Sequence, residues 1–295
     1  MTAFPVPRTA RIHLLTVALV GILVAWALPQ GFSFWRSVVI GTGWIGCGLL
    51  VSSLLLMVRE PWLASWLGGL EAMYRWHHRY GVAAYLFFLL HPLALVADAW
   101  GESAGVAWAS VAPWQEGWPV WLGWGALLCM MAGLAVSLAP RLAYATWRTL
   151  HHLLTLSVVL AGAHLVLLGL ELHLVLALLV ALLVLLWRFL RADYGLAAKP
   201  YVVDQVRRPA HGVVDVCLRP LAQPITARPG QFVVVAFFDG PGFKGCREYH
   251  PYTLSAIDPN GQLSMGIKAL GDCTEHMQSV QVGTDVRVQG PFDFR

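Results

Sequence analysis

Long apolar stretches free of Asp, Glu, Lys and Arg dominate the first two thirds of the chain and alternate with short polar segments. A helix needs roughly 20 such residues to cross the hydrocarbon core of a bilayer. Five stretches reach or approach this length, and a sixth is shorter: 38–58, 80–97, 117–140, 149–170, 172–187 and 12–28. The pattern predicts six transmembrane helices. The first is expected to be retained, because no small-residue cleavage site follows it.

The pattern changes at residue 200, where short runs rich in β-branched residues are separated by turns that mostly contain Gly or Pro. About six strands in about 95 residues predict an antiparallel β-barrel, with one short helix over 274–280. The expected fold is therefore an all-α membrane bundle of six helices over 1–198, followed by a soluble β-barrel domain over 199–295.

Composition supports this division and excludes several classes of protein. Hydrophobic residues make up 58% of the chain and charged residues only 12%, about half the charge of a soluble domain. All 14 Trp lie between Trp26 and Trp187, and 18 of the 36 charged residues lie in 200–295. A single soluble globule and a disordered chain are excluded. The net charge of +4 comes without a basic cluster for nucleic acid, and the five Cys form no pattern typical of a disulfide scaffold or a zinc site.

The loops differ in charge. Arg and Lys concentrate in 58–79, in 139–148 and after 187, whereas 98–116 contains neither. By the positive-inside rule, both termini are expected in the cytoplasm. We expect a multi-pass protein of a bacterial-type inner (plasma) membrane, with membrane lipids as its surroundings.

The third and fifth predicted helices repeat one arrangement of histidines, a pair near the cytoplasmic end and a single one further along. The six residues are His77, His78 and His91, and His151, His152 and His164. A separation of 12 to 14 residues is roughly 20 Å along a helix axis. Polar groups within a membrane are costly and usually functional. Two haems stacked across the membrane, each held by one His from each helix, require this spacing.

Helix geometry decides between the paired histidines only in part. From His77 to His91 the rotation falls about 40° short of four turns, whereas His78 misses alignment by about 140°. His77 is therefore favoured as the ligand. On the fifth helix neither His151 nor His152 aligns with His164 if the helix is ideal.

Several segments resemble a known family. REYHPYTLSA, Pro229-Gly230-Gln231-Phe232, IKALGDCTEHM and VQGPFD are similar to the ferredoxin-reductase-type FAD domain of NADPH oxidases and ferric reductases. The membrane half resembles the ferric-reductase-like transmembrane domain of the same proteins. The resemblance covers roughly 12–293.

The resemblance implies two b-type haems and FAD. It assigns His77 and His151 to the inner haem, because the first His of the fifth-helix pair is the family's ligand and Gly81 follows His77 at the usual spacing. It assigns His91 and His164 to the outer haem. The haem propionates have as candidate partners His78, Arg79, Arg148 and His152. The residues implied for FAD are Tyr249, His250, Pro251, Tyr252, Thr253, Lys268, Gly271, Asp272 and Thr274.

The function that follows is a flavocytochrome b, an oxidoreductase that moves electrons from cytoplasmic FAD through two haems to ferric iron or O₂ on the outer side. NAD(P)H would be the donor through a nucleotide-binding domain that does not follow residue 293, so we expect a truncated chain. The alternative is a membrane electron-transfer subunit that a separate reductase partner reduces, without NAD(P)H oxidation of its own.

Overall fold

The computed structural model describes residues 7–28, 31, 33–139, 142–169, 172–228 and 230–293. Pro229, one of the residues of the family resemblance, lies outside this range. The chain divides into two compact units. The helical unit contains 1–57 and 75–184, and the sheet unit contains 58–74 and 185–295.

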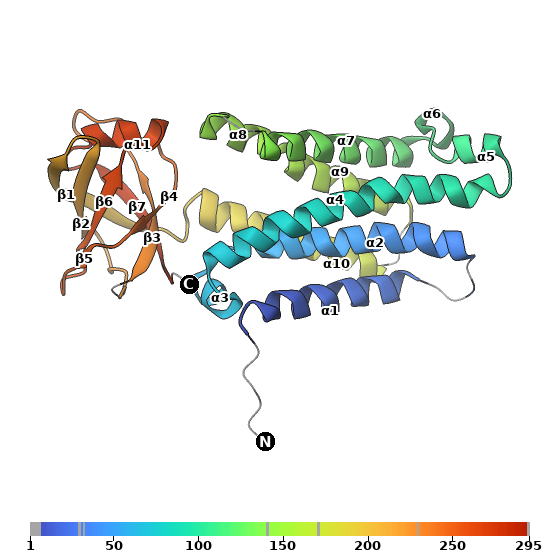
Figure 1. Cartoon of the computed structure of the whole chain (residues 1–295), viewed down its shortest axis with the longest axis horizontal. Helices are drawn as coiled ribbons and strands as arrows, with labels where there is room; N and C mark the ends of the chain where they lie inside the picture. Colours follow the sequence, from blue (N-terminus) through green and yellow to red (C-terminus); the bar gives the residue numbers. More distant parts are fainter. Residues whose placement is uncertain are drawn as a thin grey trace, which may run out of the picture. The chain divides into compact units, whose positions relative to one another are not determined.

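Six stretches of helix within the described residues are long and apolar enough to cross a membrane, which confirms the six predicted spans. Five of the spans lie on single helices: α1 (Ala10–Ala27), α2 (Phe34–Leu55), α4 (Leu70–Trp100), α7 (Trp118–Leu138) and α10 (Leu172–Arg188). The fifth span along the chain is formed by α8 (Tyr144–His151) together with α9 (Leu153–Leu167). Two short helices, α5 (Ala104–Ala109) and α6 (Pro113–Glu116), connect α4 to α7. Within this unit α1 packs on α2, and α7 packs on α9 (Figure 1).

Few side chains of these helices are buried in the protein alone, and many large apolar ones are exposed, among them Leu14, Val17 and Leu183. A helix that is apolar on every side is expected where lipid replaces water around the bundle. The buried positions include small polar residues, with Ser52, Ser53 and Ser157 all at or below 4% exposure. Two of these hydroxyls, those of Ser53 and Ser157, donate to backbone carbonyls of other helices.

The fifth predicted span is not one continuous helix. It is divided at His152, which lies between α8 and α9, and the N–H of His152 donates to the carbonyl of Thr149 at 3.2 Å. This is a tighter, three-residue hydrogen bond in place of the four-residue bond of an α-helix. The rotation between His151 and His164 consequently cannot be counted on an ideal helix.

The described residues of the sheet unit form a seven-stranded antiparallel sheet with the order β4-β3-β7-β1-β2-β6-β5 (Figure 1). The strands are β1 (Lys199–Ala210), β2 (Val213–Pro220), β3 (Gln231–Phe237), β4 (His250–Thr253), β5 (Ala256–Ile257), β6 (Leu263–Lys268) and β7 (Asp285–Asp293). All six predicted strands are present, and β5 is an additional pair of residues. The predicted short helix is observed as α11 (Asp272–His276) followed by a 3₁₀ turn, Met277–Ser279.

The expected closed barrel is not confirmed, because the strand pairing leaves β4 and β5 at opposite edges of the sheet. These two edges belong to one short stretch of chain. The N–H of Leu254 donates to the carbonyl of Gln231 on β3, and the N–H of Ser255 donates to the carbonyl of Ser264 on β6. Apolar residues from most strands, such as Val214, Val235 and Met265, form the core of the sheet unit and are fully buried.

The sheet unit also includes the loop after α2 and the end of α10. Arg191, in the π-helical end Phe189–Asp193, contacts Glu60 with its Nε 2.5 Å from Oε1, and Arg59 pairs with Asp193 at 3.4 Å. Glu60 directly precedes α3 (Pro61–Leu67). These ion pairs join 58–74 to 185–198, and Gln289 of β7 donates to the carbonyl of Ala192 at 2.9 Å. Both segments therefore belong to the sheet unit, whereas the expected membrane bundle extended to residue 198.

Cys246 and Cys273 form a disulfide, with their Cα atoms 5.8 Å apart. The cysteine pattern had indicated no disulfide framework. The two residues are 27 positions apart in the sequence, so only the folding of the sheet unit brings them into contact.

Candidate cofactor sites

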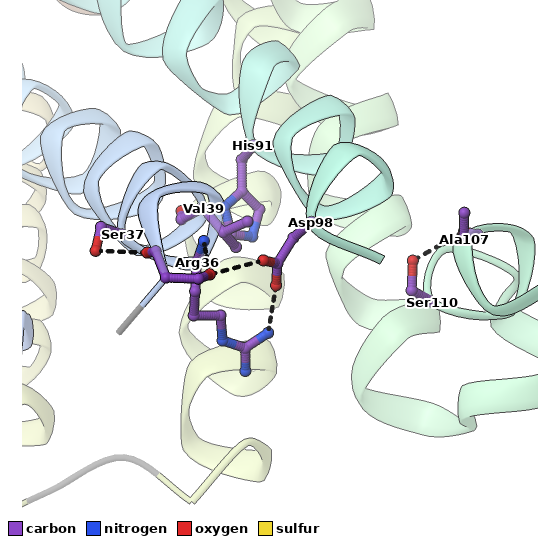
Figure 2. A network of polar contacts seen from close by, with 8 residues as sticks. Arg36, Ser37, Val39, His91, Asp98, Ala107 and Ser110 are labelled. Atoms are coloured by element: carbon purple, nitrogen blue, oxygen red, sulfur yellow. Dashed lines mark hydrogen bonds and ion pairs between the residues drawn. The ribbon is translucent and has the colours of Figure 1, made fainter. Parts of the chain in front are cut away.

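His91 lies on α4 and is half-buried against α2. Its Nδ1 is 3.0 Å from the carbonyl oxygen of Val39, one of the contacts drawn in Figure 2. A carbonyl oxygen only accepts hydrogen bonds, so Nδ1–H of His91 is the donor. A neutral imidazole protonated at Nδ1 has an unprotonated Nε2, which is the form that coordinates a metal.

His164 on α9 repeats this arrangement against α7. Its Nδ1 is 2.6 Å from the carbonyl oxygen of Pro119. In both pairs of helices a glycine four residues after the accepting carbonyl faces the imidazole. A Cβ atom added to Gly43 would lie 3.2 Å from Nδ1 of His91, and one added to Gly123 would lie 3.1 Å from Nδ1 of His164. Each glycine therefore makes room for the histidine ring.

His77, near the start of α4, contacts Ser53 near the end of α2. Nδ1 of His77 is 3.0 Å from the Ser53 carbonyl oxygen and 2.8 Å from its Oγ, and that Oγ donates to the His77 carbonyl at 2.9 Å. Because the hydroxyl proton is used in this last bond, both oxygens of Ser53 accept from Nδ1–H. Nδ1 of His77 is therefore the donor in both contacts.

His151, the last residue of α8, contacts Ser137 of α7. The Ser137 Oγ is 2.8 Å from Nδ1 of His151 and also donates its single proton to the carbonyl of Gly133 at 2.8 Å. The hydroxyl must therefore accept from Nδ1–H of His151. The Trp147 ring stacks on the His151 ring, with centroids 4.8 Å apart and planes inclined by 20°.

The four histidines thus share one type of contact, in which Nδ1–H donates to a group on a neighbouring membrane helix. Fixing the tautomer and ring orientation through the second nitrogen is how proteins commonly prepare a metal-binding histidine. The residues present therefore fit the binding of haem iron, which these imidazoles would hold through Nε2. The assignment of ligands stays a prediction, and these contacts are what supports it.

The spare member of each histidine pair is exposed, as are both arginines named as propionate candidates. These four residues are His78, Arg79, Arg148 and His152. Arg79 places its guanidinium 4.6 Å from the centre of the Trp76 ring. Within each pair, the residue that contacts the neighbouring helix is the first, which agrees with the implied choice of His77 and His151.

Sequence reasoning missed the groups that orient the histidines: Ser53, Ser137, the carbonyls of Val39 and Pro119, and the two glycines. One signal was present. Gly43 and Gly123 are each followed by Trp, so both facing helices contain a Gly-Trp dipeptide. The backbone carbonyls leave no trace in a sequence.

An ion pair joins α2 and α4 close to His91. The Arg36 guanidinium lies 3.7 Å from one carboxylate oxygen of Asp98, and Ser33 Oγ donates to the other oxygen at 3.2 Å. Figure 2 shows Arg36 and Asp98 on the same side of the helix pair as His91. These contacts hold the start of α2 against the end of α4.

The residues implied for FAD differ in where they point. β4 is an edge strand that pairs with β3, placing His250 opposite Val235 and Thr253 opposite Phe232. Pro251 and Thr253 are exposed, whereas Tyr252 points into the core and is 8% exposed. Burial raises the pKa of Tyr252 to about 12. The face of β4 open to a flavin is therefore that of Pro251 and Thr253.

Tyr249 is enclosed within the sheet unit. The guanidinium of Arg59 lies 5.5 Å from the centre of its ring, and a Cβ on Gly195 would collide with its hydroxyl. Desolvation raises the pKa of Tyr249, and the nearby Arg59 charge opposes this shift. These contacts tie Tyr249 to the end of the last helix.

The second implied FAD segment surrounds the start of α11. Lys268, Gly271 and Asp272 are exposed. The N–H groups of Leu270 and Gly271 donate to Thr274 Oγ1 at 2.9 and 3.0 Å. Thr274 therefore uses both of these N–H groups, and they are not available to a phosphate. The exposed Lys268 remains as a cation for phosphate.

Ser137→Ala is expected to weaken haem binding at His151 by about 10–100-fold, the usual cost of removing a residue that orients a metal-binding histidine. Haem transfer from the purified protein to an apo-haemoprotein measures this. Ser37→Ala is the matched control, because that hydroxyl donates to its own helix at the carbonyl of Ser33. Equal haem loss from both variants would contradict the role of Ser137.

Comparison with known proteins identifies a family for part of the membrane region. Residues 42–162 match the family model described as "Ferric reductase like transmembrane component". The matched range includes three of the four candidate ligands, His77, His91 and His151, and ends two residues before His164. None of the curated proteins matches the chain.

Several solved structures match about a third of the chain. The ferredoxin reductase of carbazole 1,9a-dioxygenase is 23% identical with a TM-score of 0.28, over 33% of this chain and 30% of that one. The cytochrome b5 reductase domain of Ulva prolifera nitrate reductase is 15% identical with a TM-score of 0.27, over 32% and 40%. The FAD/NAD-binding domain of Vibrio cholerae O1 biovar El Tor nitric oxide dioxygenase is 20% identical with a TM-score of 0.28, over 34% and 46%. The chain thus spans less than half of each, and these TM-scores are too low to establish a shared fold.

Proposed function

The membrane part of this chain is a ferric-reductase-like transmembrane domain, and from this premise we propose that the protein is a transmembrane flavocytochrome b. In this proposal two b-type haems lie within the helical unit, and FAD binds the sheet unit on the cytoplasmic side. Electrons ultimately derived from NAD(P)H leave on the outer side to ferric iron or O₂. Both termini are cytoplasmic, in a bacterial-type inner membrane.

The repeated histidine arrangement carries this proposal. Two groups of helices, α2 with α4 and α7 with α8 and α9, each hold two imidazoles by Nδ1, so that Nε2 would be the atom that binds a metal. Within each group the two histidines are 13 or 14 residues apart, about 20 Å along a helix. That spacing suits two cofactors at different depths in the membrane.

The residues of this chain have separate tasks in the proposed function. His77 and His151 would hold one haem, and His91 and His164 the other. Ser53, Ser137 and the carbonyls of Val39 and Pro119 keep these imidazoles in the tautomer that binds metal. Haem and FAD, when bound, supply one-electron transfer and the conversion of two-electron to one-electron steps.

The flavin assignment rests on the open face of β4 and on Lys268. Pro251 and Thr253 are exposed on an edge strand, and β4 lies close to β6, which ends at Lys268. A flavin ring against β4 and its phosphates near Lys268 would use these groups. Tyr252 and Tyr249 would support the site from within rather than contact the ligand.

The test uses the full chain purified in detergent. Its haem content should be two b-type haems per chain, and light-reduced FAD should reduce them under anaerobic conditions. The reduced protein is then mixed with a ferric chelate without oxygen, or with O₂ while superoxide is measured. Rapid reoxidation by one of these identifies the acceptor. A purified protein without b-type haem would overturn the proposal.

A further inference from the structure

Four potential metal ligands meet in the sheet unit, outside the residues that would hold haem. One ligand atom from each of Glu248, His250 and Cys273 lies within 4.8 Å of the other two. The sulfur of Cys246 is bonded to that of Cys273, so it lies beside these three residues. The four residues, called the cluster below, offer two sulfurs, an imidazole and a carboxylate.

One pair of ligand atoms in the cluster has the spacing found in a tetrahedral metal site. His250 Nε2 lies 3.3 Å from Glu248 Oε2, and both side chains are largely shielded, with 24% and 12% exposure. Two nitrogen or oxygen ligands that bind zinc at 2.0–2.1 Å in a tetrahedron are about 3.3 Å apart. The observed spacing therefore suits a metal ion without movement of these two side chains.

The backbone before β4 is shaped to present these side chains. Arg247, between Cys246 and Glu248, has a φ of 57°, which is uncommon for a residue other than Gly. A Cβ on Gly245 would collide with the carbonyl oxygens of Phe237 and Phe238, so the segment lies directly on the end of β3. Unusual backbone conformations of this kind concentrate at functional sites.

The charges around the cluster are compatible with a cation. Arg247 is the nearest residue in sequence with a positive charge, and its guanidinium pairs with the carboxylate of Asp239 at 2.6 Å. Lys244 contributes its backbone carbonyl to a contact with His276 Nε2 at 2.5 Å. The carboxylate of Glu248 therefore faces His250, whereas Arg247 is neutralised elsewhere.

We propose that the reduced form of this protein binds one zinc-like divalent cation through Cys246, Glu248, His250 and Cys273. The disulfide and the metal site exclude each other. A dithiol donates two electrons and two protons to the Cys246–Cys273 disulfide and is itself oxidised to a disulfide. The metal ion then replaces the two thiol protons, which pass to solvent, and is held by two thiolates, the imidazole and the carboxylate. Two thiolates with imidazole favour zinc over harder cations such as magnesium.

The experiment counts zinc on the full detergent-solubilised chain. Because His250 also belongs to the proposed flavin segment, no FAD is added. Protein treated with a dithiol and freed of it anaerobically is dialysed against zinc chloride, and retained zinc is measured by mass spectrometry. We expect one zinc per reduced chain, and none at this site in the untreated, disulfide-bonded chain. X-ray absorption at the zinc edge should show zinc–sulfur distances of about 2.3 Å and zinc–nitrogen or zinc–oxygen distances of about 2.0 Å.

Substitutions assign the site. Cys246→Ser with Cys273→Ser should weaken zinc binding by more than about 100-fold, since losing ligands costs at least as much as losing the groups that orient them. Cys217→Ser is the matched control, because Cys217 lies on β2 and contacts Gln262 instead. The comparison of reduced and oxidised wild-type protein needs no substitution, so it decides the matter even if the double variant does not fold. Failure of the reduced wild type to retain zinc, or equal retention by a folded double variant, would overturn the proposal.

Discussion

Replacing His91 or His164 with alanine is expected to remove the outer haem, so that the purified protein contains one haem per chain instead of two. Each of the two imidazoles would supply one ligand to the outer haem. The apolar side chains that face the lipid have no group that could replace a lost imidazole. Transfer of electrons to an outer acceptor should stop, because the second of two carriers in series is missing. Haem content, measured as the pyridine haemochrome, and reoxidation by a ferric chelate give the two readings.

His211→Ala is the matched control for the outer site, because this exposed histidine lies in the turn between β1 and β2. It should retain both haems. Normal haem content in the His91 and His164 variants would show that these residues do not bind haem, whatever happens to the activity.

His77→Ala is expected to remove the inner haem, whereas His78→Ala should retain both. Nδ1 of His77 is fixed by Ser53, but the His78 side chain is exposed. The same contrast is expected on the fifth span, where His151 contacts Ser137 and His152 is exposed at the junction between α8 and α9. The haem content of the four single variants separates ligands from neighbours.

If His78 or His152 contacts a haem propionate, replacing it should leave the haem bound and shift the midpoint potential of that haem. This change is smaller than the loss of haem expected for a ligand. Loss of haem from the His78 or His152 variants, with retention in the His77 or His151 variants, would reverse the assignment. Redox titration of each variant distinguishes the two roles.

The element boundaries followed closely from local patterns. The six apolar stretches are helical, the fifth with a break at His152, and the alternating runs after residue 200 are strands. Burial in lipid and pairing in a sheet act on each segment over its whole length. Whether the sheet closes into a barrel could not be predicted in the same way. Closure depends on residues 254–255, whose N–H groups donate to β3 and to β6, two strands that are distant in the sequence.

The candidate ligands were partly visible in the sequence. The rotation along an ideal helix places His77, and not His78, on the same side as His91. This count applies to the structure because α4 remains helical from Leu70 to Trp100 despite Pro92. The same count failed for His151, since the break at His152 changes the rotation between the two parts of the span. The apolar pattern is continuous across His152, so it did not reveal the break.

Hydrophobicity and residue spacing are properties of single segments, so they predicted which segments enter the membrane, which form strands and which histidines are candidate ligands. Only the packing of the helices shows which nitrogen of each histidine donates to a neighbouring helix. That nitrogen is set by the carbonyls of Val39 and Pro119 and by Ser53 and Ser137, all on other helices. Folding of the sheet unit likewise brings Cys246 and Cys273 together with Glu248 and His250. Contacts between segments far apart in sequence depend on how those segments pack, and a local pattern contains no record of that packing.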